Sequence, residues 1–278
     1  MRDRNIVFGN VTALLLLLTV LCTPALAHEP VFSIGPETIW QGGMGIETEF
    51  EFEQGDGASL SALHYEILYG LTENWSLQFS APYILKRKEA GETERGFGDL
   101  GIRTKYQFYR KDLLGAQHKI TGIGGIKLPT GDDDAEPALG TGSTDFLVGA
   151  SYGYESRTWY HFATLTYKLR TKDGTRNPGD RLSLDAAVGL RPSQTEYRDM
   201  DLVYLLEANF EIEFRDKLQG IGLPNTGGET IWLGPTALIS PNPQWMFKAG
   251  IQFPVIQKLK GDQRRDDFRA VFSVEFHF

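Results

Sequence analysis

The side chains of this 278-residue chain that could do chemistry are acids and bases set at every second position of otherwise apolar or neutral segments. Glu47, Glu49 and Glu51 follow this pattern. Because successive side chains of a β-strand point to opposite faces, each such segment would have one charged face and one apolar face. The charged candidates chosen on this basis, which we expect to share one interior, are Glu47, Glu49, Glu51, Glu66, Arg103, Lys105, Lys119, Lys127, Glu207, Glu211 and Glu275.

These charges are unevenly distributed among the predicted strands. The first predicted strand, residues 44–53, would be flanked by Glu66 on the second and Glu275 on the last. The bases of the fourth, fifth and seventh strands are Arg103, Lys105, Lys119, Lys127, Lys168 and Arg170. If the apolar faces meet lipid, opposed acidic and basic walls would set up a transverse field that orients dipolar solutes and selects ions. Alternatively, the charges pair across the lumen and seal it, because about twelve strands lie between a filled barrel and an open porin.

Catalytic and cofactor motifs are absent from the sequence. It has no G-x-S-x-G elbow, no H-E-x-x-H motif and no G-x-x-x-x-G-K-[ST] phosphate loop. We therefore expect neither an enzyme nor a cofactor.

Two features offer weak candidates for metal binding. His28 would become the N-terminal residue after signal cleavage and would offer an amine and an imidazole, but one histidine is not a metal site. The acidic run Asp132-Asp133-Asp134-Ala135-Glu136 lacks the glycine and the terminal glutamate spacing of a calcium loop. We expect a solvated acidic loop and no metal.

The elements that must position the charges are about twelve alternating segments. Each is close to the ~9–11 residues that a tilted transmembrane strand needs. Tight turns alternate with longer polar loops, which is typical of a membrane barrel with turns in the periplasm and loops outside. The predicted strands are residues 44–53, 60–71, 75–85, 98–110, 117–129, 144–154, 157–170, 181–191, 201–213, 229–240, 244–256 and 267–278.

The N-terminal residues indicate export. Arg2 and Arg4 precede an apolar run over residues 11–21, and Ala25-Leu26-Ala27 forms an A-x-A cleavage site. We expect a signal peptide over residues 1–27, a periplasmic N-terminal segment over residues 28–43 and a barrel over residues 44–278. The single cysteine, Cys22, falls inside the signal, so the mature chain would contain no disulfide.

The C-terminal run alternates without a break from Phe268 to Phe278. The last strand of an outer-membrane barrel pairs with the first, and a terminal Phe is typical of the signal that the barrel-assembly machinery reads. We therefore expect that machinery, outer-membrane lipid and lipopolysaccharide as partners. The net charge of −8 argues against nucleic acid as a partner.

These patterns predict an all-β fold, a transmembrane antiparallel up-and-down β-barrel of about 12 strands in the cell outer membrane. A soluble β-sandwich or lipocalin-like protein also shows alternation, and a need for detergent would distinguish the two. The terminal Phe, the alternation of turns and loops and the strand lengths favour the membrane barrel.

Two stretches resemble a known family. Gly125-Ile126-Lys127-Leu128-Pro129-Thr130-Gly131, followed by Leu139-Gly140-Thr141-Gly142-Ser143-Thr144-Asp145, is similar to the LPTG…LGTGS-x-D pattern of an outer-membrane barrel family. That family is labelled for the meta-cleavage pathway of phenol degradation, and its members are often described as transporters. The resemblance implies a barrel that passes hydrophobic or aromatic solutes, and it brings no established binding residues.

The function expected from the sequence is therefore passive passage of small solutes, hydrophobic or aromatic in the light of the resemblance. A non-conducting surface scaffold or adhesin is the first alternative, because long loops without a pore would serve it. A lipid-modifying membrane enzyme is the second, and it would need a lipid-facing Ser-His pair.

Overall fold

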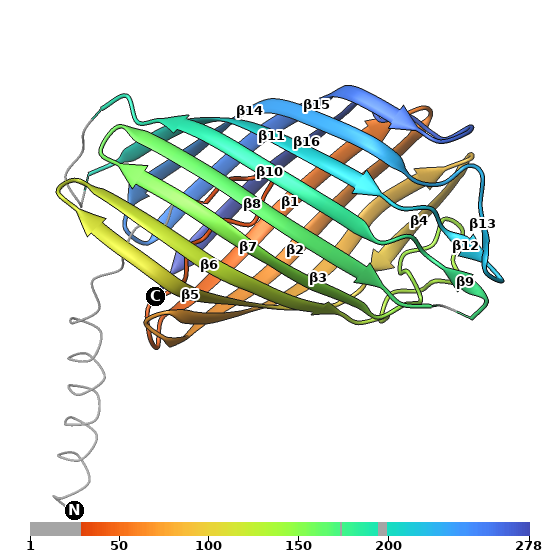
Figure 1. The fold of residues 1–278 in the computed structure, drawn as a ribbon, viewed down its shortest axis with the longest axis horizontal. Coiled ribbons are helices and arrows are strands. Elements are labelled where there is room, and N and C mark those ends of the chain that lie inside the picture. Colours follow the sequence, from red (N-terminus) through yellow and green to blue (C-terminus); the bar gives the residue numbers. More distant parts are fainter. Residues whose placement is uncertain (1–28, 173, 194–198) are drawn as a thin grey trace, which may run out of the picture.

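In the computed structural model, residues 29–172, 174–193 and 199–278 are described, so the predicted signal peptide and His28 lie outside the described residues. Twelve of the described strands close into an antiparallel barrel (Figure 1), which confirms the predicted fold. They are β1 (Met44–Gly55), β2 (Ala58–Thr72), β3 (Trp75–Glu89), β5 (Gly101–Leu113), β6 (Ala116–Lys127), β7 (Asp145–Ser156), β8 (Trp159–Arg170), β10 (Arg181–Leu190), β11 (Asp201–Glu213), β14 (Gly228–Asn242), β15 (Trp245–Leu259) and β16 (Phe268–His277).

Closure of the barrel depends on β1 and β16, which pair along their lengths with Glu47 opposite Glu275. Each strand otherwise pairs with its neighbours in the chain, and β2–β3 completes the ring. The backbone groups of the wall are therefore satisfied within it, as a structure inside lipid requires.

Four short strands lie outside the twelve-strand ring. The strand β4 (Glu92–Phe97) pairs with β3 in an antiparallel hairpin. The sequence had predicted a loop for this segment. The strands β9 (Arg176–Asn177), β12 (Lys217–Leu218) and β13 (Ile221–Gly222) form a small separate sheet. All four lie at the end of the barrel that carries the long loops, the loop end, while the C-terminus lies at the opposite, termini end (Figure 1).

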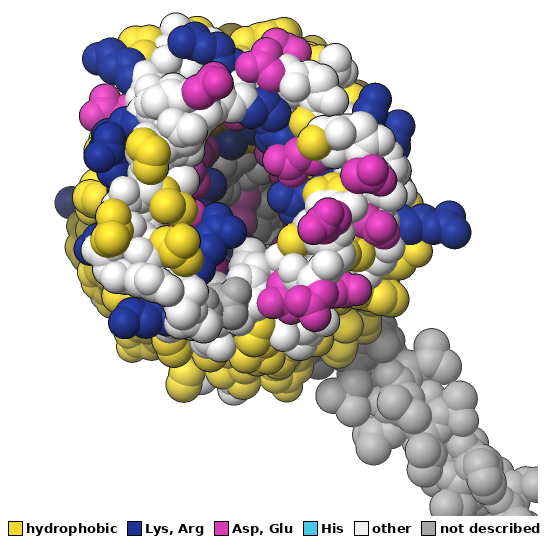
Figure 2. Space-filling model, turned by 90° about the vertical axis from the view of Figure 1, so that its right-hand side faces the viewer, with side chains coloured by type: hydrophobic (Ala, Val, Ile, Leu, Met, Phe, Trp, Pro, Cys, Tyr) yellow, Lys and Arg dark blue, Asp and Glu magenta, His cyan; other side chains and the backbone are white. Residues whose placement is uncertain are grey.

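The side chains of the wall are arranged opposite to those of a soluble protein. Leu206 is 54% exposed on the outside of β11, whereas the adjacent Glu207 is 1% exposed on the inside. Hydrophobic side chains cover much of the outer wall in Figure 2. Such an apolar exterior would be unfavourable in water and is stable in lipid, so this is a barrel of the cell outer membrane. No helix among the residues described is both long and apolar enough to cross a membrane.

One apolar cluster lies inside the barrel toward the termini end. It is formed by Tyr160, Phe162, Ala187, Val203, Leu205 and Leu238. Val31 packs against this cluster, although it precedes the first strand by more than ten residues. The sequence analysis set residues 28–43 apart as a segment before the barrel. Their described part, residues 29–43, enters the lumen.

Candidate functional site

The lumen is occupied by residues 29–43, which we call the plug. Its backbone is held by β11, where the Glu207 carboxylate accepts hydrogen bonds from the amides of Val31 at 2.8 Å and Phe32 at 3.0 Å. The Asn209 side-chain amide donates to the Phe32 carbonyl at 3.1 Å. Thr236 also donates to Glu207, at 2.7 Å, so this buried carboxylate is well satisfied.

The adjoining part of the wall, from β8 to β6, holds the next part of the plug. The hydroxyl of Thr164 donates to the Ile34 carbonyl at 2.8 Å, and that of Thr121 donates to the Pro36 carbonyl at 2.5 Å. A side chain at Gly153 would lie only 2.6 Å from Pro36 Cγ, so the close approach of β7 requires a glycine there. The wall thus satisfies backbone groups that the plug, which has no regular secondary structure, leaves free.

Two ion pairs join the plug to the basic wall. Glu29 contacts the ammonium of Lys105, and Glu37 contacts that of Lys119. The side chains of Lys105 and Glu37 are only 5% and 6% exposed. Buried charges of this kind need partners, and here the plug supplies them.

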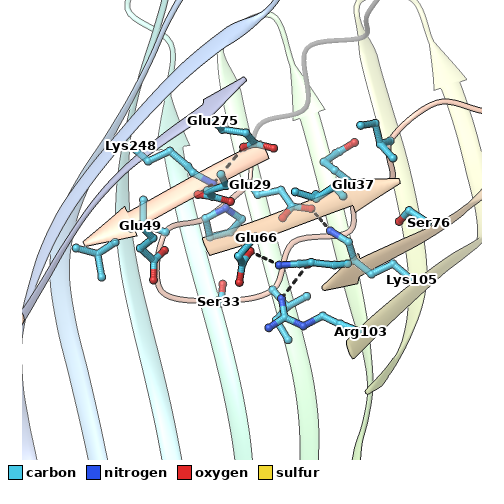
Figure 3. A pocket seen from close by; sticks show the side chains of 18 of the residues that line it. Glu29, Ser33, Glu37, Glu49, Glu66, Ser76, Arg103, Lys105, Lys248 and Glu275 are labelled. Carbon is cyan, nitrogen blue, oxygen red and sulfur yellow. Dashed lines mark hydrogen bonds and ion pairs between the residues drawn. The ribbon is translucent and has the colours of Figure 1, made fainter. Parts of the chain in front are cut away.

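A cavity of about 290 Å³, the inner cavity, lies between the plug and the acidic wall. In Figure 3 the carboxylates of Glu49, Glu66 and Glu275 surround the same space as Arg103 and Lys105. Lining residues on the wall include Glu47, Glu49, Glu51, Glu66, Arg103, Lys105, Lys248, Arg269, Glu275 and His277.

The acidic wall is partly neutralised by a base that the sequence analysis did not select. Lys248 of β15 lies 2.5 Å from Glu47 and 3.3 Å from Glu275. His277 contacts Glu275 at 2.6 Å, and His64 contacts Glu51 at 2.8 Å. The alternation of β15 places Lys248 on the inner face, but only the closed register shows that it lies beside β1 and β16.

Gln78 of β3 links the acidic wall to the basic wall. Its side-chain amide donates to Glu66, and its carbonyl oxygen accepts a hydrogen bond from Arg103 at 3.3 Å. Gln78 and Arg103 line the inner cavity and also a second cavity of about 290 Å³, the outer cavity. They therefore lie at the boundary between the two cavities.

The outer cavity lies nearer the loop end. Its lining includes Lys127, Lys168 and Asp145, together with the less polar Pro82 and Leu147. A further cavity of about 400 Å³ is lined by residues of the loops and of β11 and β14, among them Arg264 and Asp266. Figure 2 shows a hollow at this end, with both acidic and basic side chains around it.

The loop from residue 128 to residue 144 is held over the outer cavity by Asp99. The Asp99 carboxylate accepts hydrogen bonds from the amides of Gly131 and Thr141, both at 3.0 Å, and from Lys127 at 2.8 Å. Leu139 of the loop packs on the inner wall. Although burial raises the pKa of Asp99, the bonds from Lys127, Gly131 and Thr141 outweigh it and hold the pKa below its ordinary value.

The structure places all eleven charged candidates on the interior side of the wall. The inner cavity brings together Glu47, Glu49, Glu51, Glu66, Arg103, Lys105 and Glu275. Lys119 and Glu207 contact the plug, and Lys127 lines the outer cavity. Glu211 pairs with Arg269 at 3.0 Å and Arg181 at 3.3 Å. The plug residues Glu29 and Glu37 were not candidates, because a non-alternating segment gives no sign of which side chains face a lumen.

Within the described parts of the chain, no group of three or more His, Cys, Asp or Glu side chains is arranged to hold a metal ion. The acidic loop Asp132–Glu136 instead contributes backbone contacts, since the Asp132 carbonyl accepts from the amides of Leu139 and Gly140 at 2.7 and 3.0 Å.

An apolar outer wall and a charged interior define an outer-membrane β-barrel, with a plug in its lumen. The chain belongs to the family described as "Putative MetA-pathway of phenol degradation", whose model matches residues 27–264.

Solved structures share the fold. An outer-membrane channel from Pseudomonas putida F1 is similar over 90% of this chain and 100% of its own, with a TM-score of 0.74 at 13% identity. The NanC porin is similar over 83% of this chain and 98% of its own, with a TM-score of 0.54 at 8% identity. No curated protein matches the chain in sequence.

Proposed function

We propose that the protein is a gated channel for the passive passage of small solutes across the outer membrane, with residues 29–43 as its gate. The observation that carries this proposal is that the plug lies between the inner cavity and the basic wall, inside the lumen of an outer-membrane barrel. The resemblance implied hydrophobic or aromatic solutes. The charged lining of the inner cavity favours solutes that carry a polar or ionic group.

The contacts of the plug are made with wall side chains and with one end of β2, and none of them replaces a pairing between neighbouring wall strands. Five hydrogen bonds join the plug backbone to wall side chains, two backbone bonds join Gly42 and Gly43 to Gly70 of β2, and two ion pairs join plug carboxylates to Lys105 and Lys119. Each hydrogen bond is worth about 1 kcal/mol net, somewhat more where the Glu207 carboxylate accepts. A plug held in this way can leave the wall without unfolding the barrel, because the strand ladders do not depend on it.

A disulfide lock tests the gate. In the variant Pro36→Cys/Gly153→Cys the two thiols would lie next to each other, because a Cβ at position 153 would come within 2.6 Å of the Pro36 ring. The only native cysteine is Cys22, in the predicted signal, so the mature chain would offer no competing thiol. We expect the oxidised protein to be silent in a planar bilayer, and we expect reduction to restore discrete current steps.

Pro36→Cys alone is the control, and its current should not respond to reductant. Equal conductance of the oxidised and reduced double variant would show that the plug is not the gate. A bilayer that stays silent throughout, with folding shown by heat-dependent gel mobility, would favour the non-conducting scaffold. The proposal includes no catalytic step.

A further inference from the structure

We propose that the basic side chains Arg103, Lys105, Lys119 and Lys168 form a binding track for small organic carboxylates, and that the plug closes the channel by placing its own carboxylates on that track. The inference rests on the proposed channel function, because it names the solute class of the same lumen. We call these four residues the basic track.

The basic track runs through both cavities. Arg103 and Lys105 share the inner face of β5 and line the inner cavity, and Arg103 also lines the outer cavity. Lys168 of β8 lines the outer cavity, where it lies opposite Arg181 in the register of β8 and β10. Lys119 lies on β6 toward the termini end. A solute that enters from the loop end would therefore meet a base at each stage of its passage.

The part of the track nearest the loop end carries charge without an ion-pair partner among the described residues. Within the described parts of the chain, Arg103 donates only to the neutral side chain of Gln78, at 3.3 Å, and Lys168 contacts no carboxylate. Lys127, in the same cavity, is by contrast paired with Asp99 at 2.8 Å and Asp145 at 3.2 Å. Two unpaired bases in a cavity of about 290 Å³, partly shielded from water, attract an anion strongly.

The part of the track nearest the plug is already occupied by carboxylates. Glu29 is paired with Lys105, and Glu37 is paired with Lys119. These two pairs show that a carboxylate fits against the basic track in this lumen. A solute carboxylate that reached Lys105 would compete with Glu29 for the same ammonium, so entry of the solute would weaken the hold on the plug.

The lining of the outer cavity also favours an anion that carries an apolar group. Pro82 and Leu147 contribute apolar surface, while Gly101 and Gly125 leave the wall without side chains at two positions. On the far side, the inner cavity is lined by Glu47, Glu49 and other acids of the opposite wall, which would repel a second negative charge. The best fit is a small monocarboxylate with a compact apolar group.

The test is a binding titration of the full-length mature protein in detergent micelles, with potassium benzoate as the probe and benzylammonium chloride as a cation of similar size. We expect benzoate to bind and benzylammonium not to bind. Replacing the internal competitors in Glu29→Gln/Glu37→Gln should tighten benzoate binding by about tenfold, since one or two charge-assisted contacts become available. Lys105→Gln/Lys119→Gln should weaken it by a similar factor.

Lys168→Gln is a second variant that breaks no ion pair of the described residues, so its folding is not at risk from an orphaned carboxylate. It should also weaken benzoate binding, whereas Lys260→Gln, on the exposed loop end, should leave it unchanged. Equal binding of benzoate and benzylammonium, or no tightening in Glu29→Gln/Glu37→Gln, would overturn the proposal. Because binding in micelles needs no ion flow, a protein that binds benzoate but never conducts would refute the channel and leave the basic track standing.

Discussion

Glu207 is the residue on which the position of the plug depends most directly. Its carboxylate accepts two plug amides and is 1% exposed. In Glu207→Gln one acceptor oxygen is replaced by an amide that cannot accept, so a bond worth about 1.5–3 kcal/mol is lost. We expect the open probability in single-channel recordings to rise about tenfold or more. Glu213→Gln, on the same face of β11 but paired with Arg170 and Arg181, should leave it unchanged.

Three acids of β1 should set the sign of ion preference once the plug is displaced. Glu47, Glu49 and Glu51 all line the inner cavity. Replacing the three with Gln removes negative charge from one wall and leaves the bases of the other, so the reversal potential under a salt gradient should move toward anion selectivity. Glu92→Gln, on the exposed strand β4, is the matched control. An unmoved reversal potential would mean that ions do not pass this wall.

At the scale of elements, the loop of residues 128–144 is an outer strap whose docking depends on Asp99. Asp99→Asn removes the charge that accepts from Lys127 and weakens the bonds from Gly131 and Thr141. We expect faster cleavage within residues 132–136 by a protease of broad specificity. Asp133→Asn, on the exposed tip of the same loop, should cleave at the native rate. Equal rates in all three proteins would show that Asp99 does not hold the strap.

The contacts of the Asp99 carboxylate also make docking of the strap dependent on pH. The pKa of Asp99 is lowered when the loop is docked. At a pH above the ordinary pKa of 3.8, the ionised carboxylate therefore stabilises docking in full. That stability is lost as the pH falls through the lowered pKa. Hydrogen exchange of residues 129–142, corrected for the intrinsic effect of pH, should therefore show less protection at pH 3 than at pH 6. Asp99→Asn should remove the difference.

The strands could be predicted from the sequence because lipid enforces a strict alternation over their whole length. All twelve wall strands overlap the predicted segments, and the same parity indicates which charges face inward. The short strand β4 was assigned to a loop, because its exposed polar residues show no apolar face. The ion pair between Lys248 and Glu47 could not be predicted. It depends on how the strands pair in the closed barrel, and the sequence of β15 alone does not show that pairing.

The plug is the part of the site that sequence could not reveal. Its residues have no periodic pattern, and their conformation is set by the wall far along the chain: Val31 is bonded to a carboxylate 176 residues away. Polar groups on a segment without secondary structure are satisfied by whatever surface surrounds them, and only closure of the barrel provides that surface. A prediction from the local sequence pattern therefore places residues 28–43 in a segment separate from the barrel.

At the scale of the whole molecule, closure requires that the last strand find the first. Met44 and Phe278 exchange two backbone hydrogen bonds, at 2.9 and 3.0 Å, just beyond the paired residues of β1 and β16. These bonds use only the backbone of Phe278, and its ring is 55% exposed. We therefore predict that the ring serves recognition by the barrel-assembly machinery more than it stabilises the finished barrel.

Two measurements on Phe278→Ala separate these roles. Refolded in micelles, the variant should keep its heat-dependent gel mobility and lose no more than about 0.5 kcal/mol, as expected for an exposed side chain. In cells, the amount of folded barrel in the outer membrane should fall about tenfold, an effect that corresponds to about 1.4 kcal/mol of lost recognition.

Phe146→Ala, on an exposed ring of β7, is the matched control and should assemble normally. A variant that assembles normally would contradict recognition through the terminal ring. A loss of stability in micelles large enough to explain the cellular loss would assign Phe278 a structural role, because the seam between β1 and β16 would then depend on its side chain.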